Sequence, residues 1–193
     1  MKFVDSEFST ILEVKNSKFI THLCPYELFT DMMEKLKKTH PKARHFVYAY
    51  RYLNEFDQIV ENSSDDGEPK GTSGKPSLSV LAGADFINTA VIVVRYFGGI
   101  RLGTGGLVKA YSDAVNLVVK SSDIKDFVQL ESKQLTLQYS QLSQIEYTLT
   151  KYEIKIKNKI FTDTICLSLE ATDSNFKKLS KELFLDNILE EID

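Results

Sequence analysis

Glycine is confined to one part of this chain of 193 residues, where it could help to bind an anion. All nine glycines lie between Gly67 and Gly106, most densely just after a run of β-branched residues. Glycine permits positive φ angles and close approach of the backbone to another group. Free N–H groups at the start of a helix attract phosphate or carboxylate. The candidate binding residues of this loop are Arg95, Gly98, Gly99, Arg101, Gly103, Thr104, Gly105, Gly106 and Lys109.

The same glycine loop has a second interpretation that needs no ligand. Glycines between a strand and a helix also permit a tight turn and close packing. The residues alone favour neither interpretation over the other.

An acidic segment from Ser63 to Pro76 is a second candidate site. Carboxylates beside hydroxyls could bind a divalent cation, act as a general base, or meet basic groups of a partner. Asp and Ser side chains also satisfy backbone groups in turns, and the residue types favour that interpretation. The candidate binding residues here are Ser64, Asp65, Asp66 and Glu68.

A third candidate segment, from Arg44 to Arg51, combines cations with aromatic side chains. Arg44, His45 and Arg51 could contact phosphate, and His45 could act as a base. Tyr48, Tyr50 and Tyr52 alternate along the segment, so they could stack on nucleobases or form one core face of a strand. A single histidine near a strand is more often structural.

Two familiar nucleotide-binding motifs are excluded. The P-loop requires Ser or Thr after Gly-Lys, but Pro76 follows Gly74-Lys75. The dinucleotide fingerprint requires Gly or Ala where Val108 stands. Cys24 and Cys166 are far apart in the sequence, and neither belongs to a CxxC motif, which argues against a disulfide framework or a thiolate zinc site. The sequence therefore predicts no cofactor and no metal.

Composition and charge narrow the function classes. The chain is 42% hydrophobic and 26% charged, and no apolar run approaches the roughly 20 residues of a membrane span. Asp5, Glu7 and Glu13 argue against a signal peptide, so we expect a cytoplasmic protein. The net charge of -3 gives no general attraction to nucleic acid, so such binding would need a local basic patch.

Residue patterns predict two α+β domains, 1–130 and 131–193. In the first, strands are expected at 8–14, 19–23, 45–52, 57–60 and 89–96, and helices at 26–39, 77–81 and 104–120. The run at 89–96 is typical of a strand buried on both faces. In the second, strands are expected at 133–139, 153–158, 160–170 and 187–192, and helices at 141–151 and 173–184. That order is typical of a ferredoxin-like domain.

Several motifs in order resemble those of the YigZ/IMPACT family over residues 1–120. The matching segments are Lys15-Asn16-Ser17-Lys18-Phe19, Arg44-His45, Tyr48-Ala49-Tyr50-Arg51, Ser63 to Pro69, Gly71 to Pro76, and the stretch from Arg95 through Tyr111. Many relatives have a cysteine near position 47, where this chain has Val47, which argues against a thiol-based mechanism.

The resemblance implies a fold and a class of function. It implies an N-terminal domain like domain IV of elongation factor G and a C-terminal domain like its ferredoxin-like domain V. Eukaryotic relatives regulate translation by competing for an activator of a translation-initiation-factor kinase.

We therefore expect a translation-associated regulatory protein that binds RNA, the ribosome or a translation factor through its glycine-rich surface. The first alternative is an enzyme acting on a phosphorylated or nucleotide ligand, and the second is a regulator that recognises a helical partner protein. No membrane partner is expected, no catalytic residue is assigned, and no oligomeric state is predicted.

Overall fold

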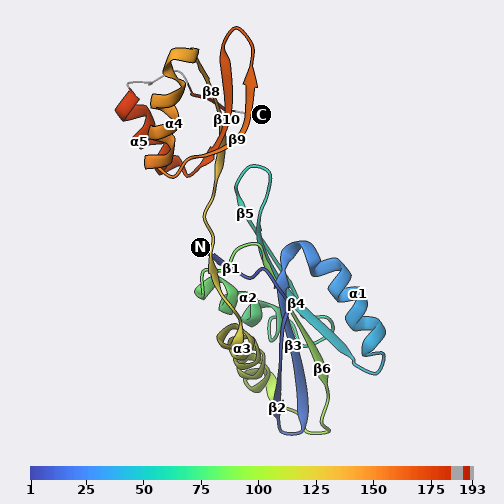
Figure 1. Ribbon diagram of the computed structural model, residues 1–193. Helices are drawn as coiled ribbons and strands as arrows, with labels where there is room; N and C mark the ends of the chain where they lie inside the picture. The colour runs from blue at the N-terminus through green and yellow to red at the C-terminus, as the bar shows by residue number, and fades with distance from the viewer. Residues whose placement is uncertain (184–188, 192–193) are drawn as a thin grey trace. The chain divides into compact units, whose positions relative to one another are not determined.

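The protein folds into two compact units, Met1–Phe127 and Val128–Asp193. The structure is a computed structural model that describes residues 1–183 and 189–191. Both units mix helices with antiparallel sheets, so the predicted α+β class is confirmed (Figure 1). None of the described helices has the length and apolar character needed to cross a membrane.

A five-stranded antiparallel sheet organises the N-terminal unit. Its strands, in spatial order, are β2 (Phe8–Val14), β3 (Ser17–Pro25), β6 (Thr89–Tyr96), β4 (His45–Leu53) and β5 (Ile59–Ser64). The central strand β6 is buried along almost its whole length, as its β-branched residues predicted. Because the strands are antiparallel, the loops that connect them lie at the two ends of the sheet.

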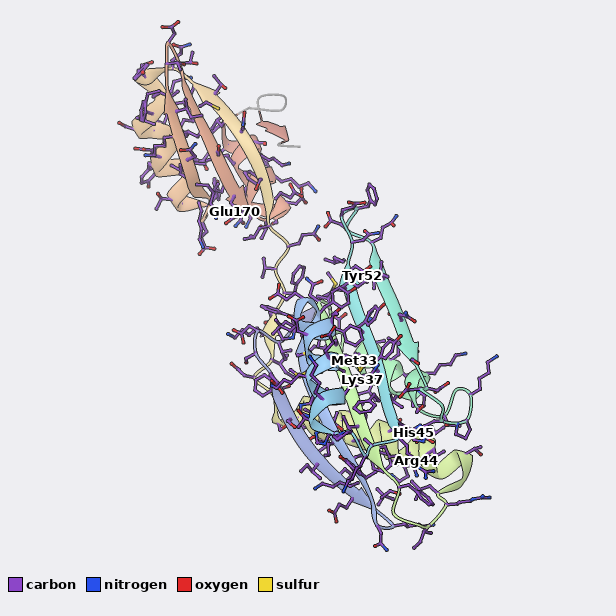
Figure 2. All side chains as sticks on the ribbon, turned by 90° about the vertical axis from the view of Figure 1, so that its right-hand side faces the viewer. Met33, Lys37, Arg44, His45, Tyr52 and Glu170 are labelled. Atoms are coloured by element: carbon purple, nitrogen blue, oxygen red, sulfur yellow. The ribbon has the colours of Figure 1, made fainter. Side chains whose placement is uncertain are left out.

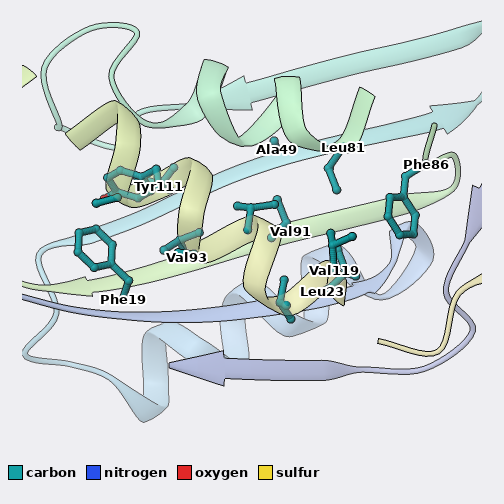
Figure 3. Close-up of a cluster of buried hydrophobic side chains, with 14 of the residues drawn as sticks. Phe19, Leu23, Ala49, Leu81, Phe86, Val91, Val93, Tyr111 and Val119 are labelled. Carbon is teal, nitrogen blue, oxygen red and sulfur yellow. The ribbon is translucent and has the colours of Figure 1, made fainter. Parts of the chain in front are cut away.

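Helices cover both faces of this sheet (Figure 1). The helix α1 (Phe29–Thr39), which follows the 3₁₀ turn η1 (Tyr26–Leu28), packs Met32 and Leu36 on one face. On the other face lie α2 (Gly74–Gly83) and α3 (Gly103–Ser121). Figure 3 shows the core between these two helices and the sheet, with Phe19 and Tyr111 at one end and Phe86 at the other.

Several details of the N-terminal unit differ from expectation, and one is that the first three residues of the helix expected at 26–39 form the 3₁₀ turn η1. The helix expected at 77–81 begins three residues earlier, at Gly74. The strand expected at 57–60 begins at Ile59, because Asn54 Oδ1 accepts hydrogen bonds from the N–H groups of Phe56 and Gln58 and closes a turn first. The two-residue strands β1 (Lys2–Phe3) and β7 (Lys125–Asp126) pair with each other and are too short to leave a pattern in the sequence.

The C-terminal unit is ferredoxin-like, as predicted. Its elements are β8 (Glu131–Leu137), η2 (Tyr139–Gln141), α4 (Leu142–Lys151), β9 (Lys155–Phe161), β10 (Ile165–Ala171), α5 (Asp173–Leu183) and β11 (Leu189–Glu191). The sheet order β11-β8-β10-β9 places the first and third strands of the unit side by side. The predicted strand 160–170 is wrong at its start, because residues 162–164 form the turn between β9 and β10. Residues 184, 187, 188 and 192 of the predicted last elements lie outside the described residues.

Candidate functional site

The three candidate segments meet at one end of the N-terminal sheet. In the strand register, His45 at the start of β4 lies opposite Arg95 near the end of β6. Lys18, just after the β2–β3 turn, lies opposite Tyr96. Figure 2 shows Arg44 and His45 at this end and Tyr52 toward the other end of β4. We call this surface the loop end and define it as residues 15–18, 42–46, 64–76 and 95–106.

Asp65 fixes the acidic segment of the loop end. Its Oδ1 accepts hydrogen bonds from Ser73 N–H at 3.1 Å, Ser73 Oγ at 2.7 Å and Gly74 N–H at 2.8 Å, and its Oδ2 accepts one from Gly71 N–H at 2.7 Å. Burial raises the pKa of Asp65, but these hydrogen bonds outweigh burial and leave the pKa below its ordinary value. The carboxylate therefore caps the start of α2, which explains why that helix begins at Gly74.

Asp66 connects the same segment to β4. Its Oδ2 accepts a hydrogen bond from Phe46 N–H at 2.6 Å, and its carbonyl oxygen lies 2.7 Å from His45 Nδ1. Asp66 N–H in turn donates to Ser64 Oγ at 3.2 Å. The side chains of Asp65 and Asp66 thus satisfy backbone groups, in agreement with the structural interpretation of this segment.

Glu68 forms a buried ion pair behind the loops. Its Oε1 accepts hydrogen bonds from Arg95 Nη1 at 2.5 Å and from Tyr111 Oη at 2.9 Å. Only 4% of the Glu68 side chain and 6% of the Arg95 side chain are exposed. Burial and the neighbouring Glu68 carboxylate raise the pKa of Tyr111, so the phenol remains a hydrogen-bond donor. His45 Nε2 lies 4.0 Å from the same Glu68 oxygen.

Arg95 extends this network to the glycine loop. Its Nη2 lies 3.4 Å from Ser17 Oγ, and Ser17 Oγ also accepts a hydrogen bond from Gly98 N–H at 3.2 Å. The guanidinium lies over two aromatic rings, 5.4 Å from the centroid of Phe19 and 5.8 Å from that of Phe97. Since the side chain is buried, direct binding of a ligand by Arg95 would require its ion pair with Glu68 to open.

Gly98 is required by close packing. A Cβ atom at this position would lie 2.0 Å from the carbonyl carbon of Asn16, which no side chain could accommodate without moving the backbone. Gly99 and Gly103 instead have positive φ angles of 84° and 73° in open space. The loop therefore uses glycine both for packing and for backbone conformation.

Positive charge at the loop end is largely unneutralised. The exposed or half-exposed cations without an acidic partner within 4 Å, among the residues that the structure describes, are Lys15, Lys18, Lys42, Arg44, Lys70, Lys75 and Arg101. Lys109, farther along α3, pairs with Asp113 at 2.9 Å. Gly103, Thr104 and Gly105 are exposed in the first turn of α3, which has no side-chain cap. This surface is the local basic patch that nucleic-acid binding would need.

Arg51 is not part of the loop end. It lies opposite Thr89 at the far end of β6, six residues along β4 from His45, or roughly 20 Å away at the usual strand rise. Its side chain is buried and donates to Glu61 Oε1 and to the carbonyl of Phe86, each at 2.6 Å. The sequence correctly predicted that Arg51 lies on the same strand as His45. The alternation of side chains along a strand, however, does not indicate which end of the strand lies near a site.

The tyrosines of β4 pack against the α1 side of the sheet. Tyr52 stacks on Tyr26 with ring centroids 4.1 Å apart, and Tyr48 lies 5.1 Å from Phe29. Tyr48 and Tyr50 belong to the hydrophobic cluster beneath α1. These contacts support the core-face interpretation over base stacking.

Ser17, Phe97 and Tyr111 were not among the predicted site residues. Each stands in a segment that carried the family resemblance, and that was the signal available for finding them. In the described part of the chain, no group of three or more His, Cys, Asp or Glu side chains is arranged to hold a metal ion.

Comparison with known proteins identifies the family. A family model described as the Impact N-terminal domain matches residues 15–119, which include all of the loop end. The chain belongs to the IMPACT family. An IMPACT family member of Haemophilus influenzae is 38% identical over 174 residues, covering 89% of this chain and 84% of that protein. The IMPACT family member YigZ of Escherichia coli is 35% identical over 178 residues, covering 91% and 87%.

A solved structure supports the same fold. A crystal structure described as that of a hypothetical protein aligns with a TM-score of 0.68 and 33% sequence identity, and covers 100% of this chain and 97% of its own. The family membership predicted from the sequence motifs is therefore confirmed.

Proposed function

We propose that this IMPACT family member is a cytoplasmic, translation-associated regulatory protein that binds RNA, the ribosome or a translation factor through its loop end. The observation that carries this proposal is the gathering, around an exposed glycine loop, of cations that have no acidic partner among the described residues, in a chain with a net charge of -3. A localised basic patch on an acidic protein is the electrostatic footprint of a nucleic-acid contact. The family resemblance supports translation as the process.

The geometry divides the candidate residues into two groups with different roles. Arg44, Arg101 and Lys75 are exposed and would contact phosphates directly. Glu68 and Arg95 are buried together, so their role in binding is to hold the glycine loop in place. Asp65 holds the acidic segment in the same way, through backbone groups.

The enzymatic alternative has less support. An enzyme acting on a phosphorylated ligand would use carboxylates to bind a cation or to activate a nucleophile. Here Asp65 and Asp66 accept backbone hydrogen bonds, and Glu68 is occupied by Arg95 and Tyr111. These engaged carboxylates favour binding over catalysis.

The proposal is tested by measuring association with RNA and with purified ribosomes over a series of salt concentrations. Binding at low salt should weaken steeply as salt rises, because each neutralised phosphate releases counterions. Arg101→Ala should weaken binding and lower the salt dependence by about one ion, as expected for a lost phosphate contact.

Lys120→Ala is the matched control, because Lys120 is exposed on the last turn of the same helix. It should bind like the unmodified protein. An absence of association with RNA and ribosomes at low salt would contradict RNA and the ribosome as partners of the loop end.

A further inference from the structure

Phe97 is an exposed aromatic side chain in the glycine loop of the loop end. Half of it is accessible (50%), and it belongs to none of the hydrophobic clusters formed by the described residues. Its neighbour along the loop, Ile100, is also exposed, at 48%. An exposed aromatic side chain beside cations that have no acidic partner among the described residues suits a ligand that is both apolar and anionic.

The Phe97 ring lies against the buried side chain of Arg95. The Arg95 guanidinium lies 5.8 Å from the centre of the Phe97 ring and is itself fixed by Glu68 and Ser17. A cation over an aromatic ring stabilises that ring's position. The buried Arg95 side chain therefore helps to orient the exposed Phe97 ring.

The two residues after Phe97 are glycines, so neither places a side chain beside the ring. Beyond its chain neighbours, no atom lies within 4 Å of where a Cβ of Gly99 would stand. Arg101 follows four residues after Phe97, so both side chains lie within the reach of a few nucleotides. Lys18, from the β3 strand, is opposite Tyr96 at the same end.

We infer that Phe97 is a stacking platform for an unpaired base of single-stranded RNA, with neighbouring phosphates bound by Arg101 and Lys18. This inference rests on the proposed function and names the class of RNA. A nucleotide offers a flat apolar base and a negative phosphate a short distance apart, which matches one exposed ring flanked by cations. A base paired within a duplex has no free face to offer, so duplex RNA should bind more weakly.

An acidic protein segment is the competing ligand. It would satisfy the cations, but a partner protein usually buries a broader apolar surface than Phe97 and Ile100 provide. The experiment therefore includes an acidic polypeptide.

The test uses the full chain and labelled RNA of about 12 nucleotides, single-stranded or duplex, with binding followed by fluorescence anisotropy. Single-stranded RNA should bind more tightly than the duplex. Phe97→Ala should weaken single-stranded binding about tenfold or more, while the salt dependence stays unchanged because no charge is lost. Phe56→Ala is the control, because Phe56 is 70% exposed on the β4–β5 turn.

A second variant reports stacking directly. The chain contains no tryptophan, so Phe97→Trp introduces a single fluorophore at the platform. It should retain binding, and its fluorescence should be quenched by single-stranded RNA as the base stacks, whereas Phe56→Trp should not respond.

The outcomes separate the inference from the proposed function. If RNA binds but Phe97→Ala binds normally and the Phe97→Trp signal does not change, the stacking inference is overturned and the proposed function stands. If no RNA binds even at low salt while the Phe97→Trp protein keeps its fold by circular dichroism, both the inference and RNA as the ligand are overturned. If polyglutamate displaces RNA at equal charge and Phe97→Ala weakens both ligands equally, the surface recognises an acidic polypeptide and the inference is overturned.

Discussion

Five of the eight lysines of the C-terminal unit have an acidic partner within 4 Å among the described residues, whereas the exposed cations of the loop end have none. Lys151 pairs with Glu182 at 2.6 Å, Lys157 pairs with Glu170 at 3.2 Å, and Lys159 pairs with Glu146. At the loop end, cations such as Arg44 and Arg101 have no acidic partner among the described residues, and the charge that is neutralised is buried. A count of lysines would not separate these two regions, whereas the positions of their carboxylates do.

The two regions also differ in how their backbones are specified. The C-terminal unit contains no glycine, and its strand β10 alternates strictly between buried and half-buried residues. The loop end concentrates glycine, positive φ angles and backbone-to-carboxylate hydrogen bonds. Substitutions should therefore lower the free energy of unfolding far more at the loop end than at matched positions of the C-terminal unit.

The largest difference should come from breaking an ion pair in each region. Glu68→Ala leaves the Arg95 guanidinium buried without its counterion, which should lower the free energy of unfolding by about 3–5 kcal/mol. Glu146→Ala removes a half-exposed pair with Lys159 and should cost below about 1 kcal/mol. Urea unfolding followed by circular dichroism measures both. Equal losses in the two variants would show that the buried pair has no special structural role.

Glycine packing gives the next largest effect. Gly98→Ala places a methyl group against the Asn16 backbone, where the available distance is 2.0 Å, and should destabilise the protein by about 1–3 kcal/mol. Gly83→Ala is the control, because nothing lies within 4 Å of its Cβ position at the end of α2. Thermal unfolding should show a lowered Tm for Gly98→Ala and an unchanged or slightly raised Tm for Gly83→Ala. Unchanged Tm values for both would contradict the packing of Gly98 against the β2–β3 turn.

A smaller, pH-dependent effect should come from Asp65. Its folded-state pKa is lowered, so its contribution is complete above the unfolded-state pKa and is lost as the pH falls through the folded-state value. Asp65→Ala should cost about 1 kcal/mol at pH 7, as for other helix caps, and the difference from the unmodified protein should vanish in strong acid. Urea unfolding at several pH values measures this difference. A constant difference from pH 7 down to strong acid would show that the carboxylate charge is not the stabilising group.

The sequence predicted helices and strands accurately wherever a regular pattern of apolar residues continued without interruption. The strand β6 was predicted with its observed bounds, and α3 was predicted to within one residue at each end, because both have long uninterrupted patterns. The turn between β9 and β10 was predicted at residue 159 instead of 162–164, because Thr162 and Thr164 are as suitable for a strand as for a turn.

The candidate site was predicted less completely because its contacts join distant parts of the chain. The glycine and acidic segments were recognised from composition, but the pairing of Glu68 with Arg95 and Tyr111 depends on tertiary structure that no local pattern encodes. The same limit explains why Phe97 was passed over and why Arg51 was included. Residue type identifies a candidate cation, and only the fold decides whether its charge is free.

The smallest effect should test that distinction through binding alone. Arg44→Ala removes a loop-end cation that has no acidic partner in the described part of the chain, and Lys157→Ala removes a cation that already has Glu170 as its partner. Arg44→Ala should weaken RNA binding a few-fold and lower the salt dependence by about one ion, whereas Lys157→Ala should leave both unchanged. Fluorescence anisotropy over a salt series measures both quantities without requiring any change in stability. A similar loss in the two variants would mean that the C-terminal lysines exchange their glutamate partners for phosphate, and that the binding surface extends beyond the loop end.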